Sequence, residues 1–249
     1  GTGKTRTLTF RVAHLVERGV DAQRILLLTF TNRAAREMLE RARGLVGEGV
    51  SGLWGGTFHH MANRMLRRHC EALGYKTDYT ILDQDDARNL VRACADELDL
   101  LGKHFPKPDV LLSVYSLAAN REQPVEAAAE AHFGHHPIDL KDVVKVHARY
   151  RERKRSLNAM DFDDLLVNGL LLFREHPDIL ARYQEHFLHI LVDEYQDTNC
   201  IQAEWVDRLA ARRRNLLVVG DDFQSIYSWR GADFRNILGF PKRYPDATV

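Results

Sequence analysis

The chain has 249 residues, of which 45% are hydrophobic and 28% charged, and its 35 basic and 35 acidic residues give a formal net charge of zero. This composition is ordinary for a globular protein, and the balanced charge neither indicates nor excludes a nucleic-acid partner. No apolar run approaches the roughly 18–20 residues that cross a membrane, and the first residues do not resemble a secretory signal. Three widely spaced cysteines are typical of a reduced protein. We therefore expect a cytoplasmic protein without a membrane partner.

The first part of the chain alternates between helix and strand patterns. Apolar residues recur at helical spacing in 4–18, and the continuous apolar run at 25–28 predicts a strand buried on both faces. Further patterns follow in order, a helix at 32–43, a strand at 51–57 that its glycines weaken, and a helix at 59–73. Strands that alternate with helices predict a parallel α/β sheet with helices on both faces.

The middle of the chain has a different pattern. From about 83 to 156 we find helical spacing but no convincing buried strand, and four prolines divide this stretch into short pieces. The earlier alternation then returns, with a strand at 190–192, a helix at 200–211 and a strand at 216–219. We therefore expect an α/β domain in two parts, 1–82 and 159–249, interrupted by a helical domain at 83–158.

The chain opens on half of a phosphate-binding motif. Gly1-Thr2-Gly3-Lys4-Thr5 matches the second half of G-x-x-x-x-G-K-[ST]. In such a loop, backbone N–H groups hold phosphates at a helix N-terminus, the lysine reaches the β- and γ-phosphates, and the threonine hydroxyl binds Mg²⁺. The first glycine and the preceding strand of the motif are not in this sequence. A chance match at the start of a helix therefore stays open as an alternative.

Two acidic residues follow the predicted strand at 190–192. Asp193 and Glu194 would lie at the carboxyl edge of a parallel sheet, where ligands of such sheets bind. Asp193 can hold Mg²⁺, and Glu194 can polarise an attacking water. The alternative to a metal site is that both acids are simply solvated after a core strand. The presence of Lys4 and Thr5 in the same sequence makes this alternative less favoured. Together these segments predict a site for ATP and Mg²⁺.

A third chemical segment follows the strand at 216–219. It contains Gln224, suited to sensing a γ-phosphate, and then Tyr227, Trp229 and Arg230. Aromatic rings next to an arginine suit single-stranded nucleic acid, because each stacked base contributes about 1–3 kcal/mol and the cation contacts phosphate. The alternative is that the tyrosine and the tryptophan are core residues that cap the sheet.

Together these segments resemble the superfamily 1 DNA helicases of the UvrD/Rep/PcrA type. Six matches occur in the order of the family: G-T-G-K-T at 1–5, T-F-T-N-R-A-A at 29–35, G-T-F-H at 56–59, D-F-D-D-L at 161–165, D-E-Y-Q-D-T-N at 193–199, and G-D-D-F-Q-S-I-Y-S-W-R-G-A at 220–232. They run from the first residue to near the last, and in combination they are highly specific. The resemblance implies a RecA-like P-loop NTPase domain with an inserted helical subdomain.

The resemblance also implies an activity and a role for each matching residue. The activity is ATP-driven 3′–5′ movement along single-stranded DNA, with Lys4, Glu194 and Gln224 as the catalytic residues. Phosphates would be bound by Gly1, Thr2, Gly3, Lys4 and Thr5, adenine by Arg6, and Mg²⁺ by Thr5 and Asp193. Glu194 would act as the base, and Gln224 would couple the γ-phosphate to the DNA site. The path of single-stranded DNA would be lined by Phe30, Asn32, Thr57, His59, Tyr227, Trp229 and Arg230.

Parts of the family pattern lie outside this sequence. Upstream is a segment with an adenine-reading glutamine and the first P-loop glycine. Downstream are the motifs of a second RecA-like domain, which supplies arginines to the γ-phosphate. We therefore expect the N-terminal part of a motor, with little DNA-stimulated ATPase activity alone. Its expected partners are single-stranded DNA, junctions of single- and double-stranded DNA, and the second RecA-like domain.

Other functions remain open on the sequence alone. The chain could be the motor portion of a helicase–nuclease, a P-loop ATPase of another class, or a DNA-binding P-loop module that is inactive on its own. One further segment has two interpretations: the run at 149–155 has five basic residues and one acidic residue. It predicts either a contact with duplex phosphates or a solvated helix face.

Overall fold

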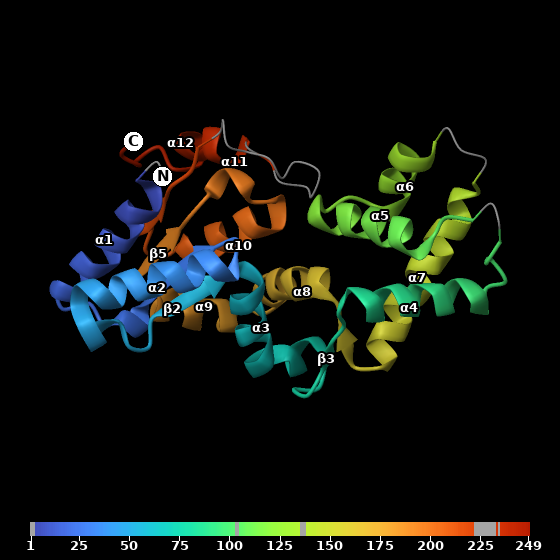
Figure 1. Cartoon of the computed structure of the whole chain (residues 1–249), viewed down its shortest axis with the longest axis horizontal. Coiled ribbons are helices and arrows are strands. Elements are labelled where there is room, and N and C mark those ends of the chain that lie inside the picture. The colour runs from blue at the N-terminus through green and yellow to red at the C-terminus, as the bar shows by residue number, and fades with distance from the viewer. Residues whose placement is uncertain (1–2, 103–104, 135–137, 222–232, 234) are drawn as a thin grey trace. The chain divides into compact units, whose positions relative to one another are not determined.

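The computed structural model describes residues 3–102, 105–134, 138–221, 233 and 235–249 (Figure 1). The chain forms two compact units, one built from residues 1–65 and 169–249 and the other from 66–168. The boundaries between them fall inside two helices, α3 (Phe58–His69) and α8 (Phe162–Glu175). The predicted helical segment at 83–158 lies within the second unit.

The first unit contains a four-stranded parallel sheet in the order β2-β1-β5-β6. Its strands are β1 (Ile25–Thr29), β2 (Trp54–Thr57), β5 (His189–Val192) and β6 (Leu216–Val218). Every residue of β1 is buried, as a continuous apolar run predicts for a central strand covered on both faces. The predicted parallel α/β sheet is confirmed.

Helices cover both faces of this sheet. On one face α1 (Lys4–Glu17) and α2 (Asn32–Val46) pack against alternate residues of β1, Ile25 and Leu27, with Leu8, Val12 and Met38 in the same core cluster. Trp54 pairs in register with Leu26, so it points to the opposite face, and its ring meets those of Tyr183 and Phe187 at the end of α9 (Pro177–His186). The unit also contains α10 (Cys200–Ala210), α11 (Arg235–Leu238), α12 (Phe240–Arg243) and the 3₁₀ turns η1 (Ala22–Arg24), η2 (Gly47–Val50) and η4 (Tyr195–Asp197).

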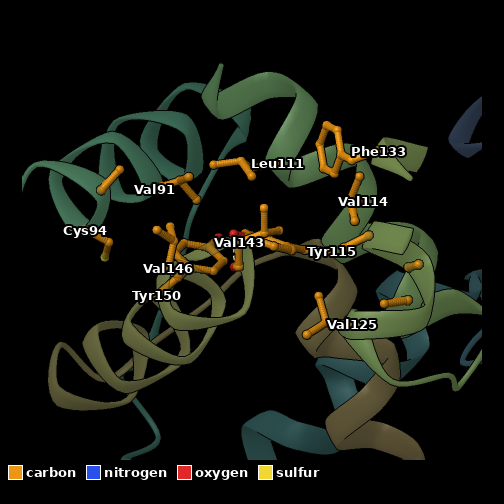
Figure 2. Packing of buried hydrophobic residues seen from close by; sticks show 14 of the residues in the cluster. Val91, Cys94, Leu111, Val114, Tyr115, Val125, Phe133, Val143, Val146 and Tyr150 are labelled. Carbon is orange, nitrogen blue, oxygen red and sulfur yellow. Dashed lines mark hydrogen bonds between the residues drawn. The ribbon is translucent and has the colours of Figure 1, made fainter. Parts of the chain in front are cut away.

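The second unit is mainly helical. Its helices are α4 (Gln84–Glu97), α5 (Pro108–Asn120), α6 (Val125–Phe133) and α7 (Leu140–Ser156), drawn from green to yellow in Figure 1, and the 3₁₀ turn η3 (Cys70–Leu73) precedes them. Figure 2 shows the core where these helices meet, with Val91, Leu111, Tyr115, Val143 and Tyr150 among the labelled side chains. None of the described helices of the chain is both long enough and apolar enough to span a membrane.

A short parallel pair, β3 (Thr80–Ile81) and β4 (Ala159–Met160), brings the two ends of the helical segment together. The sequence did not predict this pair, because two residues are too few to show the alternation that identifies a strand. Asn158 reinforces the pairing: its side-chain Oδ1 accepts from the Lys76 N–H at 2.9 Å. The helical segment therefore begins and ends at one place in its unit.

The basic run at 149–155 mainly holds its own unit together. Arg149 pairs with Glu97 of α4 at 2.7 Å, and Arg155 donates to the Leu73 carbonyl. Lys154 is buried, with its ammonium 2.5 Å from Asp161 Oδ2 and 2.6 Å from Asp164 Oδ2. Burial opposes the charge of Lys154, but the two carboxylates outweigh it and hold the pKa of the ammonium above its ordinary value. Part of the run therefore joins α7 to its neighbours, which neither interpretation of the sequence included, while Arg151 and Glu152 are exposed, as expected for a solvated helix face.

Replacing Lys154 with methionine should lower the free energy of unfolding by about 3–5 kcal/mol, because it leaves two mostly buried carboxylates without their buried cation. Lys145, on the same helix, pairs with Asp142 at an exposed position. Lys145→Met should therefore cost less than about 1 kcal/mol. Denaturant titration of both variants measures the difference, and equal losses would show that the buried cluster contributes no more than a surface pair.

Candidate active site

The parallel register brings the predicted site residues to one edge of the sheet. Leu28 of β1 pairs with Gly56 of β2 and with Val192 of β5, so these three strands end together. Asp193 directly follows β5, and its Oδ2 accepts a hydrogen bond from Thr5 Oγ1 at 3.3 Å. The first turn of α1 and the end of β5 are therefore in contact, although 188 residues separate them in the chain.

Lys4 is the first residue of α1 and lies among carboxylates. Its Nζ is 3.3 Å from Glu194 Oε2 and 3.8 Å from Asp221 Oδ2, and its side chain is only 13% exposed. Gly3, the N-cap, has φ 78°, a left-handed conformation that glycine adopts without a steric penalty. This backbone turn lets α1 begin with Lys4 directed at the ends of β5 and β6.

Asp193 is almost completely buried, at 2% exposure. Burial and the neighbouring Glu194 carboxylate raise its pKa above the ordinary value, while Thr5 and Lys4 oppose this shift. A buried carboxylate next to a threonine hydroxyl is an oxygen donor set of the kind that suits Mg²⁺. The geometry therefore fits the predicted pair of metal ligands, Thr5 and Asp193.

Glu194 has an unusual backbone conformation. Its φ of 48° and ψ of 46° are left-handed, which costs a residue with a side chain about 1–2 kcal/mol. Hydrogen bonds on both sides hold the turn: its own N–H donates to Asp193 Oδ1 at 3.1 Å, and the Tyr195 N–H donates to the Val219 carbonyl at 2.9 Å. The turn directs the Glu194 carboxylate toward Lys4.

Two further residues belong to this cluster without having been assigned a role from the sequence. Asp221 contacts Lys4, and Gln196 contacts both Glu194 and the backbone of Asp221. Asp221 could have been found, because it follows the strand at 216–219 at the same edge as Asp193. Gln196 could not, because its position depends on the left-handed turn at Glu194, which no sequence pattern indicates.

Four residues predicted to contact DNA are described, and all lie at or just beyond the ends of β1 and β2, at the same edge. Phe30 is partly exposed, and its ring centroid is 5.6 Å from that of Phe58. Asn32 is exposed at the start of α2. Thr57 is mostly buried, and its Oγ1 accepts from the His60 N–H at 3.2 Å. In this structure Thr57 therefore caps the first turn of α3.

His59 differs from the other three in its electrostatics. Burial lowers the pKa of its imidazole to about 4, so the ring is neutral near pH 7. A neutral imidazole can donate and accept hydrogen bonds but brings no positive charge to a phosphate.

The remaining predicted site residues divide into two groups. Arg6 is exposed on α1, with its guanidinium carbon 5.2 Å from the centre of the Phe10 ring, which is itself exposed. Six residues lie outside the described residues: Gly1, Thr2, Gln224, Tyr227, Trp229 and Arg230. The roles of both groups remain predictions.

Comparison with known proteins connects this geometry to a family. Residues 1–245 match the model of the UvrD/REP helicase N-terminal domain. The chain belongs to this family. Similar proteins include three named ATP-dependent DNA helicase PcrA, from Staphylococcus aureus (41% identical), Bacillus subtilis (42%) and Leuconostoc citreum (44%). The match covers 99–100% of this chain but 33–34% of theirs, so the chain spans about a third of the length of these relatives.

In this UvrD/REP helicase domain, a side chain at Gly220 would disturb the site. A Cβ added there would lie against Ile237 Cδ1 and 2.5 Å from Gln196 Oε1. Gly220→Ala should therefore lower the free energy of unfolding by about 1–3 kcal/mol, as overpacking does.

Gly44 is the matched control, since it lies inside α2 with nothing within 4 Å of an added Cβ. Gly44→Ala should raise the free energy of unfolding by about 0.5–1 kcal/mol, because alanine is the better helix former. Thermal denaturation of both variants gives the comparison. A Gly220→Ala domain as stable as the parent would mean that the space around Gly220 relaxes easily.

Proposed function

We propose that this domain binds ATP and Mg²⁺ at the carboxyl edge of its sheet and is the first half of an ATP-dependent 3′–5′ DNA helicase motor. The convergence of α1 with the end of β5 carries the proposal. Thr5 contacts Asp193 and Lys4 contacts Glu194, each at 3.3 Å, so phosphate-binding and acidic residues form one cluster. The names of the relatives, which are ATP-dependent DNA helicases, support the same activity here.

The start of α1 supplies the features that bind phosphate. Its first N–H groups point out of the helix end, and the helix dipole adds partial positive charge there. Lys4 adds a full charge within reach of the β- and γ-phosphates. In this proposal Gly1, Thr2 and Gly3 complete the loop, and Arg6 stacks on the adenine with its exposed guanidinium.

Thr5 and Asp193 would hold Mg²⁺, which when bound neutralises charge on the phosphate oxygens. Among the described residues, no three His, Cys, Asp or Glu side chains gather to hold a metal by themselves. This suits an ion that Thr5 and Asp193 share with substrate phosphates, as Mg²⁺ sites in NTPases do. Burial makes the charged form of Asp193 unfavourable, and a bound Mg²⁺ would stabilise that charged form. The burial of Asp193 therefore favours its proposed role as a metal ligand.

Glu194 would act as the general base. Its carboxylate lies beside Asp193, so it can accept a proton from a water directed at the γ-phosphate while Asp193 keeps its own role. Gln224 would report the state of the γ-phosphate to the DNA path, as the family resemblance implies. The strained turn at Glu194 supports the assignment, since strain of this kind persists where the surrounding structure enforces it.

Single-stranded DNA would follow the edge beyond β1 and β2. Phe30, Asn32, Thr57 and His59 all lie there, and Tyr227, Trp229 and Arg230 would complete the path with stacking rings and a cation. Junctions of single- and double-stranded DNA, and a second RecA-like domain that supplies arginines to the γ-phosphate, are the further partners that we propose. The greater length of the relatives supports that second domain.

Two substitutions separate nucleotide binding from hydrolysis. Lys4→Ala should abolish ATP binding, because it removes the point charge that reaches the phosphates. Glu194→Gln should keep ATP·Mg²⁺ binding but slow hydrolysis by about 10²–10⁴-fold, because the water loses its base. Both are measured in the intact protein by titration with a fluorescent ATP analogue and by phosphate release.

Glu185→Gln is the control, since this exposed glutamate pairs with Arg212 and Arg213 and should leave both measurements unchanged. Normal turnover in Lys4→Ala would refute the phosphate site. Lost binding in Glu194→Gln would instead make Glu194 a metal ligand.

Trp229→Ala should weaken single-stranded DNA binding by about 1–3 kcal/mol with little dependence on sequence, because stacking uses the face that all bases share. It should also uncouple ATP hydrolysis from DNA. Fluorescence anisotropy with oligonucleotides of different sequence tests the intact protein. Unchanged affinity together with a collapse of thermal stability would mark Trp229 as a core residue.

A further inference from the structure

Gln196 is a buried glutamine, 1% exposed, that uses both ends of its side-chain amide. Its Nε2 donates to Glu194 Oε2 at 2.9 Å and, at 3.4 Å, to Asp197 Oδ2. Its Oε1 accepts from the Asp221 N–H at 2.9 Å. The backbone N–H can only donate, so the oxygen must face Asp221 and the NH₂ must face the carboxylates. The orientation of this amide is therefore fixed.

Lys4 and Gln196 both contact the same oxygen of the candidate base, Glu194 Oε2. Lys4 is also the residue proposed to bind phosphates, so its contact with Glu194 competes with that task. Gln196 is neutral and buried, and it has no such second task in the proposed reaction. It is therefore the donor suited to hold the Glu194 carboxylate while hydrolysis proceeds.

The turn that contains Gln196 is fastened to its surroundings. Thr198 Oγ1 donates to the Tyr195 carbonyl at 2.7 Å, and the Thr198 carbonyl accepts from Asn236 Nδ2 at 2.9 Å. The Asp233 N–H donates to the same carbonyl at 3.0 Å. Asp221 and Asp233, which are the described residues on either side of 222–232, are thus both hydrogen bonded to the turn at 195–198.

We propose that Gln196 is a positioning residue for ATP hydrolysis: it holds the Glu194 carboxylate in its catalytic orientation and ties it to the end of β6 through Asp221. The inference rests on the proposed function, because it requires Glu194 to be the base. Gln196 acts through Glu194, so its loss should lower turnover while leaving nucleotide binding nearly unchanged. A residue that only stabilises the fold would not produce this division.

The test is steady-state ATP hydrolysis by the intact protein with single-stranded DNA, for Gln196→Ala and Gln196→Met. Supporting residues of an active site typically contribute about 10- to 100-fold, and we expect a loss of this size in kcat. The KM for ATP and the affinity for an ATP analogue should stay within about threefold, because uniform binding is untouched.

Gln202 is the matched control. It is also a buried glutamine, at 6% exposure, and its Oε1 accepts from the Asn199 N–H in the cap of α10. Gln202→Met should lower stability but not kcat. If it lowers kcat as much as Gln196→Met does, the effect is one of folding and the inference is overturned.

A double-mutant cycle with Glu194→Gln gives the decisive comparison. Once the carboxylate is gone there is nothing for Gln196 to position, so Gln196→Ala should change the residual rate by less than about threefold in that background. An equal loss in both backgrounds, or an unchanged kcat in Gln196→Ala alone, would overturn the inference. Absence of ATPase activity in a wild-type protein that also contains the proposed second RecA-like domain would instead refute the proposed function.

Discussion

The parallel pairing of β1 with β2 and β5 determines where the candidate residues at the ends of these strands lie. Because Leu28 pairs with both Gly56 and Val192, the chain leaves all three strands at the same edge. Residues that follow β1 and β5 thus become neighbours through backbone pairing, and the hydrogen bond from Thr5 to Asp193 places the start of α1 at the same edge. A shift of β5 by one residue would turn its buried side chains to the opposite face, so the apolar core maintains the register that the acidic residues require.

Among its described residues the site has more acidic than basic side chains, and in the proposed function this constrains how it binds an anionic nucleotide. Near Lys4 lie the carboxylates of Glu194 and Asp221, with Asp193 and Asp197 close by. Burial, and to a lesser degree the Glu194 charge, raises the pKa of Asp197 to about 6. Phosphate would be repelled by such a cluster unless a divalent cation accompanies it. The proposed function therefore requires the nucleotide to arrive together with its metal.

The sequence predicted the parts of the structure that depend on local pattern. The continuous apolar run of β1 indicated a strand buried on both faces, and the helical spacing at 4–18 indicated the helix that the structure has as α1. Three features could not be predicted because each depends on tertiary contacts. The pair β3–β4 is too short to show the alternation of a strand. In the sequence, Lys154 is indistinguishable from the other cations of a basic run, although it is buried against two carboxylates. Gln196 reaches Glu194 only because the backbone of Glu194 is left-handed.

The left-handed backbone of Glu194 creates a trade-off between the stability of the domain and its proposed rate of ATP hydrolysis. Glycine, and to a lesser degree asparagine, adopts a φ near 48° at little cost, so either would relieve about 1 kcal/mol of strain at position 194. Neither carries a carboxylate. Selection for a more stable domain would therefore enrich the same substitutions that remove the proposed base, while selection for activity keeps glutamate at a left-handed position. Thermostable variants of this domain are accordingly expected to gain their stability elsewhere in the fold.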